Sequence, residues 1–394
     1  MDGLVCREAT PADAEDVLKV RNAIFPPLTV EQWLADPTMT CSIAYLDGEP
    51  VGAIPLSMRE FQVAPGAIVR AAFENAVGTR EDLRGKGIGT AVIEAARTFL
   101  AGRCDELMVY RGAERTDGYR FYVKTGHRDL LYLRPLTLGE PQATETDTSV
   151  HGLSDVRALQ TEMLGCFEAT YGAFGGFPRR HATYWERQLT SQIYDVIPQE
   201  TILVRHPASG PLAAYALAGR RVLGDERTHL LITELAGLSP AATESALRGL
   251  IDFAAREAFP LDTLTSAEDP HRATFRRLGF AEHTRATMIM GQPLNPADLF
   301  RQVCAHGEAL SGLKIDYWAP LGDGTLYEAP DAVRSITLEG KDEVIYRLLN
   351  RRLDVPAAVR TEWLTIRDGD PDIVDRLAAA LPYTPWAYHH VDYV

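Results

Sequence analysis

Val77 to Thr90 reads V-G-T-R-E-D-L-R-G-K-G-I-G-T and joins a strand-like apolar run to a helical pattern. Gly85, Gly87 and Gly89 stand at every second position between the two. Glycines adopt positive φ and let backbone N–H groups converge on a ligand, while the start of a helix adds unpaired amides and its positive dipole end. This stretch therefore predicts a strand, a glycine-rich loop and a helix that cradle a pyrophosphate.

Two side chains in the loop add positive charge to this anion site, Arg84 and Lys86. The phosphate loop of NTPases is excluded because it requires Ser or Thr after the lysine, where Gly87 stands. The dinucleotide fingerprint is excluded because Val92 occupies the place of its third glycine. An ordinary glycine-rich turn without a ligand is the remaining alternative.

Arg84, Gly87 and Gly89 match an R/Q-x-x-G-x-G/A motif, and in this the chain resembles the GCN5-related N-acetyltransferases (GNAT). The resemblance implies that the loop holds the pyrophosphate of acetyl-coenzyme A and that the preceding strand offers backbone groups to the pantetheine arm. The expected cofactor-binding residues are Val77, Gly78, Thr79, Arg84, Gly85, Lys86, Gly87, Ile88, Gly89 and Thr90.

A second segment supports the resemblance. Residues 121–127 read F-Y-V-K-T-G-H and are similar to the F-Y-x-x-x-G-F segment of the family. The resemblance implies that Tyr122 protonates the departing thiolate, with Tyr119, one helical turn earlier, as the fallback. Core packing is the alternative for an aromatic residue at this place.

Three candidates remain for the base that removes the proton from the acceptor. Glu74 lies on the strand before the loop, where many family members carry an acidic residue; a solvent-facing strand position is its alternative. In three-domain relatives the terminal carboxylate, here that of Val394, serves as base. Water is the third candidate.

The strand and helix pattern of the first 140 residues starts again near residue 151. The second copy has no glycine cradle, and Phe275 stands where Tyr122 stands in the first. Residues 291–394 resemble the sterol-carrier-like domain of acetyltransferases of the enhanced-intracellular-survival type. We expect an α+β protein with mixed sheets: a catalytic GNAT domain (1–140), a degenerate GNAT-like domain (151–290) and a sterol-carrier-like domain (291–394).

Composition narrows the classes of partner. The chain has 394 residues, 46% hydrophobic and 24% charged, and a formal net charge of −14, which disfavours nucleic acid and anionic membranes and suits a cationic substrate. No apolar run reaches the length of a membrane span, and MDGLVCREAT has no signal-peptide character, which predicts a cytoplasmic location. Five scattered cysteines and ten histidines without ligand spacing predict no disulfide framework and no metal.

The sequence thus predicts an N-acyltransferase that moves an acetyl group from acetyl-coenzyme A to a primary amine of a small-molecule or peptide acceptor. Homo-oligomeric assembly is left open. The alternative is a ligand-binding or sensor protein in which the acetyltransferase domains are scaffolds and the tail holds an apolar molecule. The intact first glycine loop counts against this alternative, because a scaffold has no need of it.

Overall fold

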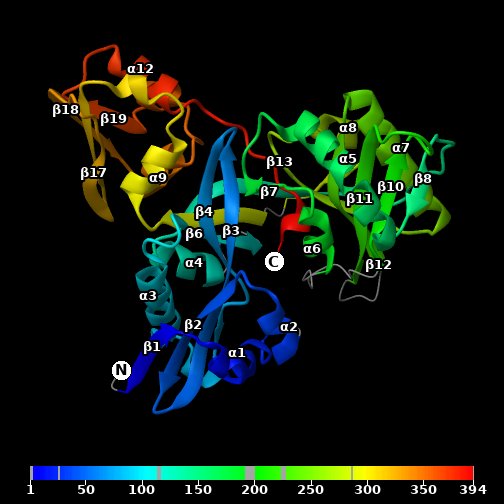
Figure 1. Cartoon of the computed structure of the whole chain (residues 1–394), viewed down its shortest axis with the longest axis horizontal. Coiled ribbons are helices and arrows are strands. Elements are labelled where there is room, and N and C mark those ends of the chain that lie inside the picture. Colours follow the sequence, from blue (N-terminus) through cyan, green and yellow to red (C-terminus); the bar gives the residue numbers. More distant parts are fainter. Residues whose placement is uncertain are drawn as a thin grey trace. The chain divides into compact units, whose positions relative to one another are not determined.

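The computed structural model describes residues 3–24, 27–112, 117–190, 200–222, 228–284 and 287–393. The chain folds into two compact units. Figure 1 labels their helices and strands. Unit 1 comprises Met1–Arg111, Arg115–Leu130 and Ile289–Tyr383, and unit 2 comprises Gly112–Glu114, Leu131–Met288 and Thr384–Val394.

The main sheet of unit 1 has the strand order β1-β2-β3-β4-β6-β15, with the short β5 beside β3. The pairs β1·β2, β2·β3 and β3·β4 are antiparallel, and the pair β4·β6 is parallel. The strands are β1 (Leu4–Glu8), β2 (Met39–Leu46), β3 (Glu49–Ala64), β4 (Ala67–Glu74), β5 (Gly78–Thr79), β6 (Glu106–Gly112) and β15 (Thr287–Pro293), and the helices are α1 (Ala14–Arg21), α2 (Val30–Ala35), α3 (Ile88–Leu100) and α4 (Asp117–Lys124). This confirms the predicted mixed sheet.

Helix α3 follows the glycine loop and packs on the sheet through one apolar face. Ile88, Val92, Ala96 and Leu100 recur every four residues and are buried in a core that includes residues of β2 and β3. Side chains four apart lie on one side of a helix, and each large apolar side chain buried in this way contributes roughly 1.5–3 kcal/mol. The apolar face therefore fixes the helix, and with it the position of the loop.

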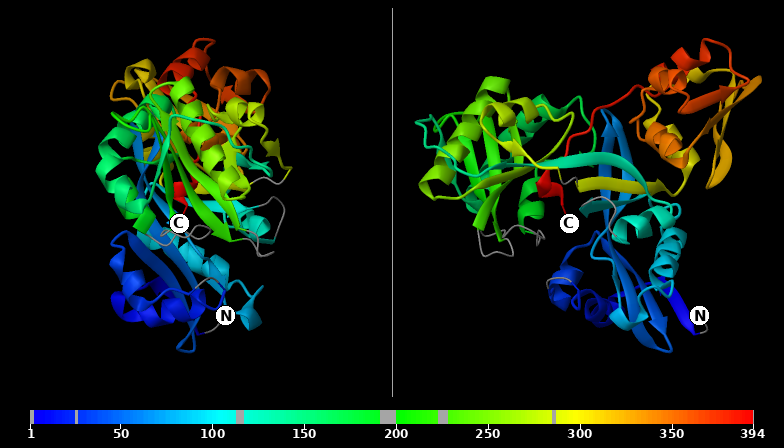
Figure 2. Two further views of the ribbon diagram at one scale, coloured as in Figure 1. Left: turned by 90° about the vertical axis from the view of Figure 1, so that its right-hand side faces the viewer. Right: turned by 180° about the vertical axis from the view of Figure 1, so that it is seen from behind.

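The rest of unit 1 carries a four-stranded sheet in the order β17-β16-β18-β19, yellow to red in Figure 2. Strands β16 and β18 are parallel, and the other neighbours are antiparallel. Its strands are β16 (Leu313–Ala319), β17 (Gly322–Glu328), β18 (Arg334–Gly340) and β19 (Leu364–Arg367), and its helices are α9 (Pro296–Val303), α10 (Asp342–Leu349), α11 (Val355–Arg360) and α12 (Ile373–Ala380). The resemblance of this part to sterol carriers stays a prediction.

Inside unit 1, helix α10 is joined to strand β6 by a buried polar contact. The Tyr346 hydroxyl donates to Glu106 Oε2 over 2.6 Å, and Asn350 Nδ2 donates to the same oxygen over 2.9 Å. Burial raises the pKa of Glu106 to about 7, although the two hydrogen bonds oppose this. Glu106 therefore keeps its proton in the folded protein at pH values at which it ionises in the unfolded chain.

We expect Glu106→Gln to change how stability depends on pH. The folded pKa lies above the unfolded one, so the wild type loses stability as the pH rises from about 4.5 to about 7, by up to roughly 3 kcal/mol. Glutamine resembles the protonated acid and carries no such loss. Melting temperatures of both proteins at pH 5 and pH 8 test this. The melting temperature of the variant relative to the wild type should be higher at pH 8 than at pH 5. The same difference at both pH values would contradict the account.

Unit 2 repeats the strand arrangement of the first sheet. Its order is β8-β10-β11-β12-β13-β7, with antiparallel neighbours except for the parallel pair β12 and β13. The strands are β7 (Arg128–Leu138), β8 (Ser149–His151), β9 (Phe177–Pro178), β10 (Ile202–His206), β11 (Ala214–Val222), β12 (Thr228–Gly237), β13 (Leu261–Ser266) and β14 (Ala281–Glu282), and the helices are α5 (Leu153–Tyr171), α6 (Tyr184–Thr190), α7 (Pro240–Arg256) and α8 (Arg272–Arg277). The internal repeat is thus present as two sheets of the same order.

Strands β7 and β15 each belong to the sheet of one repeat but follow the other repeat in the sequence. Strand β7 follows α4 directly in the sequence, yet it pairs with β13 from Leu261 opposite Leu138 to Ser266 opposite Leu133. Strand β15, which follows the second repeat, takes the last place in the sheet of unit 1. Each repeat therefore completes its sheet with a strand from a distant part of the sequence; the predicted three-domain boundaries stay a prediction.

Candidate active site

The loop before α3 has the backbone that its glycines predict. Gly85 and Gly87 have φ of 77° and 87°, and Gly87 is the N-cap of α3. Both are exposed, and a Cβ added at either would meet no atom within 4 Å, so positive φ rather than crowding requires glycine here. The first amides of α3 have no partner within the helix, and a phosphate is a suitable acceptor for them.

The side chains predicted to bind the cofactor fall into two groups. Arg84 and Lys86 are exposed, so both can reach an anion at the loop. Ile88 is 1% exposed and belongs to the core, and Gly78 is buried in β5. These two residues can offer only backbone groups to a ligand.

A β-bulge lies between β4 and β5. Glu74 pairs with Leu56 of β3, and Gly78 pairs with Ala53 of β3. Gly78 thus lies four residues after Glu74, whereas their partners on β3 lie three residues apart, so the β4–β5 side carries one extra residue. The backbone is irregular at Ala76, which has φ of 45°, an uncommon value for a residue with a Cβ. Because bulges turn backbone groups out of the ladder, this one suits a backbone contact to a bound ligand.

Gly89 is needed for a different reason from the two glycines before it. A Cβ at this position would lie 3.0 Å from Phe121 Cε2, on helix α4, and 3.8 Å from Thr79 Oγ1, on β5. Strand β5, the start of α3 and helix α4 therefore meet at Gly89. This contact brings the residue next to Tyr122 against the glycine loop.

Tyr122 itself lies on α4 and is 8% exposed. Its ring makes edge contacts with the rings of Phe121 and His127, at centroid distances of 5.3 and 5.1 Å. The fallback, Tyr119, donates its hydroxyl hydrogen to Asp129 Oδ2 over 3.2 Å. Tyr122 stays the first candidate because its helix lies against the glycine loop through Phe121.

Glu74 lies in a buried group with His127 and Gln292. Its Oε1 lies 2.8 Å from His127 Nε2, and neither side chain is exposed to solvent, although the contact is not aligned as a hydrogen bond. Gln292 Nε2, from β15, donates to His127 Nδ1 over 3.3 Å. Because Nδ1 accepts, a neutral imidazole carries its proton on Nε2, facing the carboxylate.

His127 and Gln292 are the residues that sequence reasoning missed. A signal for His127 was present, since it stands where the family segment F-Y-x-x-x-G-F ends in phenylalanine. Gln292 lies 165 positions further along the chain from His127 and carried no signal. The group joins Glu74 to Tyr122 through the His127 ring, so two predicted catalytic residues lie in one cluster.

The third predicted catalytic residue, Val394, lies outside the described residues. The described segment before it, Thr384 to Tyr393, belongs to unit 2. A role for the terminal carboxylate therefore stays a prediction.

The corresponding junction in unit 2 lacks a cradle. Ser239 caps α7, its hydroxyl accepting from the Ala242 N–H over 3.2 Å, so an amide that an anion would need has a partner. A Cβ at Gly237 would lie 2.5 Å from Thr243 Oγ1, so this glycine serves packing. Phe275 is 2% exposed and packs on Phe280. The cradle features of the first copy are therefore not repeated at this junction, and the predicted degenerate GNAT-like domain stays a prediction.

Two features are absent from the part of the chain that the structure describes. Among those residues, no group of three or more His, Cys, Asp or Glu side chains is placed to hold a metal ion. No helix there has the length and apolar character that crossing a membrane requires.

Comparison with known proteins gives one family match. Residues 10–127 match the model of the acetyltransferase (GNAT) family. This range contains the glycine loop, Glu74, Tyr122 and His127. No curated protein matches the sequence.

Solved structures resemble the chain over nearly its whole length. A probable N-acyltransferase from Enterococcus faecalis has a TM-score of 0.72 at 13% identity, with 99% of both chains covered. A GCN5-related N-acetyltransferase from Anabaena variabilis has a TM-score of 0.69 at 12% identity, covering 99% of this chain and 100% of that one. Eis1 from Mycobacterium abscessus has a TM-score of 0.62 at 14% identity, covering 97% and 99%. At such identities the likeness shows the fold, which is the α+β arrangement predicted from the sequence.

Proposed function

Because residues 10–127 match the model of the acetyltransferase (GNAT) family, we propose that this chain transfers an acetyl group from acetyl-coenzyme A to a primary amine of a small-molecule or peptide acceptor. The observation that carries the proposal is the contact between Gly89 and Phe121. It joins the anion-binding loop to the helix of Tyr122, so one site holds groups suited to binding and to chemistry.

In this proposal the first unit binds acetyl-coenzyme A mainly through backbone groups. Val77, Gly78 and Thr79 contact the pantetheine arm, and the loop from Arg84 to Thr90 binds the pyrophosphate. The open space over Gly85 and Gly87 supports the second contact, because phosphate oxygens can approach these amides closely. Arg84 and Lys86 add charge without fixing the geometry.

Catalysis in the proposal rests mainly on placement. Alignment of the amine with the thioester carbonyl replaces a bimolecular encounter. An amide of the bulge at Ala76 and Val77 can polarise the carbonyl oxygen, and Tyr122 can donate its proton to the sulfur as the thiolate departs. The amine nitrogen forms the new amide bond and loses one proton to a base.

Three bases remain in the proposal: the Val394 carboxylate, Glu74 and water. The complete burial of Glu74 beside His127 favours a positioning role for it, since a base must reach the acceptor proton directly or through one water.

We expect Glu74→Gln to lower kcat by less than about tenfold, because an amide oxygen can still face His127 Nε2. Steady-state kinetics at saturating acetyl-coenzyme A measure this. A loss of roughly 10²–10⁴ would instead assign the base to Glu74.

The acceptor is proposed by class only. A net charge of −14 suits a cationic amine. The proposal also includes a cytoplasmic location, no metal, and no nucleic-acid or membrane partner. Homo-oligomeric assembly is left open.

A screen of amines, aminoglycosides and peptides for acceptor-dependent release of free thiol from acetyl-coenzyme A tests the function. At least one amine should give turnover that is lost in Tyr122→Phe. Thermal stabilisation by an apolar ligand, with no turnover of any amine and no stabilisation by acetyl-coenzyme A, would favour the binding protein instead.

A further inference from the structure

Arg111 is a half-buried cation of unit 1 to which the proposed mechanism gives no role. It lies on β6, two residues beyond Val109, which pairs with Glu74 of β4. Its Nε and Nη2 atoms are closed to solvent and have no hydrogen-bond partner among the residues that the structure describes. Burial lowers the pKa of this guanidinium, whereas the charge of an ionised Tyr122 raises it. Arg111 is therefore a desolvated cation close enough to Tyr122 for the two charges to interact.

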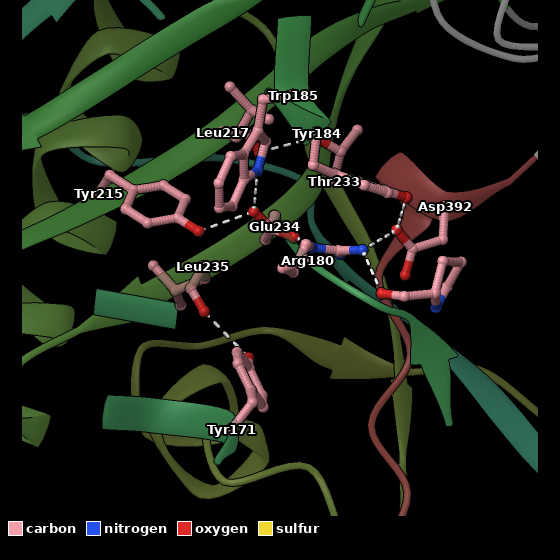
Figure 3. A network of polar contacts seen from close by, with 11 residues as sticks. Tyr171, Arg180, Tyr184, Trp185, Tyr215, Leu217, Thr233, Glu234, Leu235 and Asp392 are labelled. Atoms are coloured by element: carbon pink, nitrogen blue, oxygen red, sulfur yellow. Dashed lines mark hydrogen bonds and ion pairs between the residues drawn. The ribbon is translucent and has the colours of Figure 1, made fainter. Parts of the chain in front are cut away.

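Arg180 of unit 2 shows how the same chain pairs another buried arginine (Figure 3). Its Nη2 donates to Glu234 Oε2 over 2.6 Å, and its Nη1 lies 2.7 Å from Asp392 Oδ1, so the guanidinium lies between two carboxylates. Moving a cation out of water is costly unless an anion pairs with it. Arg111 has no such carboxylate among the described residues, which suits a partner that carries its charge only during the reaction.

A glycine on helix α4 makes room for Arg111. A Cβ added at Gly118 would lie 3.2 Å from Arg111 Cζ and 3.3 Å from its Nη1, closer than such contacts ordinarily are. Gly118 and Tyr122 stand four residues apart on α4 and therefore on one side of it, and helical side chains lean toward the N-terminus of their helix. The guanidinium thus lies one turn before Tyr122, on the side toward which the tyrosine side chain leans.

Other ionisable side chains also lie near Tyr122. The His127 ring contacts its ring at a centroid distance of 5.1 Å, and Glu74 Oε1 lies 2.8 Å from His127 Nε2. Tyr119, on the same helix, donates to Asp129 Oδ2. Carboxylates disfavour a further negative charge beside them, and a neutral imidazole does not offset this effect. The cation on β6 is the group that opposes it.

We propose that Arg111 is a positioning residue that acts through Tyr122: its guanidinium stabilises the tyrosinate that forms when the Tyr122 hydroxyl gives its proton to the departing thiolate. In this step the O–H bond breaks and an S–H bond forms, so the negative charge passes from sulfur to the phenolate oxygen. Water then restores the hydroxyl with the proton that the amine has lost. The inference rests on the acyl transfer proposed above. A guanidinium that binds an anionic group of a substrate is the alternative.

Arg111→Met is the informative variant, because an unbranched apolar side chain fits the space over Gly118 without the charge. The melting temperature should not fall, since the variant removes a half-buried cation that has no partner among the described residues. Arg111→Lys keeps the charge and tests rescue. Lys124→Met is the matched control, because it removes a cation from an exposed position of α4 two residues from Tyr122, and residues two apart do not face each other on a helix.

The first measurement is the ionisation of Tyr122, and it needs no enzyme activity. In protein labelled with ¹³C at the tyrosine Cζ, the NMR signal that is missing from Tyr122→Phe identifies this residue. The pH at which it is half ionised should be higher by about 1 or more in Arg111→Met than in wild type, because the tyrosinate loses a nearby cation. Lys124→Met should match the wild type, and Arg111→Lys should stay close to it. Equal values in Arg111→Met and wild type would overturn the inference.

The second measurement is a double-mutant cycle in kcat. Arg111→Met should lower kcat roughly 5–50-fold with little change in the KM for acetyl-coenzyme A or acceptor, because Tyr122 becomes a weaker acid. In a Tyr122→Phe background the same substitution should change kcat by less than about twofold, since no tyrosinate can form there. Arg111→Lys should keep kcat within about threefold of wild type.

Three kinetic outcomes would count against the inference. Equal losses of kcat in both backgrounds would overturn the action through Tyr122. A raised KM with normal kcat would overturn it in favour of a guanidinium that binds an anionic group of a substrate. A wild type without acyl transfer would overturn the catalytic role together with the proposed function, while the titration would still decide whether Arg111 stabilises the Tyr122 anion.

Discussion

Tyr122→Phe should lower kcat by roughly 10²–10⁴, the range for loss of a general acid, with little change in the affinity for acetyl-coenzyme A. The substitution removes only the hydroxyl, so the ring contacts with Phe121 and His127 remain and the fold should persist. Steady-state kinetics with calorimetric titration of coenzyme A measure both quantities.

Tyr119→Phe is the matched control, because it removes a hydroxyl from the same helix. Tyr119 donates to Asp129, so its loss should lower the melting temperature rather than kcat. Full activity of Tyr122→Phe with a large loss in Tyr119→Phe would move the acid to Tyr119. Full activity of both would leave protonation of the thiolate to water.

Arg84→Glu should weaken coenzyme A binding by about 100-fold or more, because it replaces a charge-assisted contact with repulsion of the pyrophosphate. Arg84 is exposed, so the fold should not change. The variant is cleaner than Gly87→Glu, which also forces a side chain into positive φ at the start of α3. Calorimetry and a melting curve separate binding from folding.

Leu238→Glu is the control for Arg84→Glu. Leu238 is 58% exposed and precedes the cap of α7, so the change adds a negative charge at the corresponding junction of unit 2. Coenzyme A affinity should stay at the wild-type value. An equal loss in both variants would contradict the assignment of the cofactor to the first unit.

Local chemistry made several elements predictable from the sequence. The Asp47-Gly48 pair is a common hairpin-turn sequence, and these residues have φ of 52° and 86°, as the turn between β2 and β3 requires. Ser239 and Pro240 begin α7 as cap and first helical residue. These signals act over a few residues, so no knowledge of the fold is needed to read them.

Features that depend on distant residues could not be predicted. The segment R128-D-L-L-Y-L-R-P-L-T-L follows the motifs of the first repeat directly in the sequence, but β7 pairs with β13, because strand pairing depends on topology as well as on the strand pattern. Residues 141–155 are polar and show no periodic pattern, yet β8 and the start of α5 lie there. Strand β8 has only three residues, too few for a periodic pattern.

The candidate site divides in the same way. The glycine loop and Tyr122 were visible because their motifs are contiguous in sequence. The contact of His127 with Gln292 depends on β15 reaching the first sheet from beyond the second repeat. Glu74 was a candidate from its strand, but its burial beside His127 followed only from the fold.

The central claim is that one glycine loop, in the first of two repeats, binds coenzyme A for acyl transfer. Calorimetric titration of coenzyme A into the full chain tests this most directly, because it counts the sites. We expect saturable binding of one molecule per chain, lost in Arg84→Glu and kept in Leu238→Glu. Two molecules per chain, or no binding to the wild type, would contradict the account.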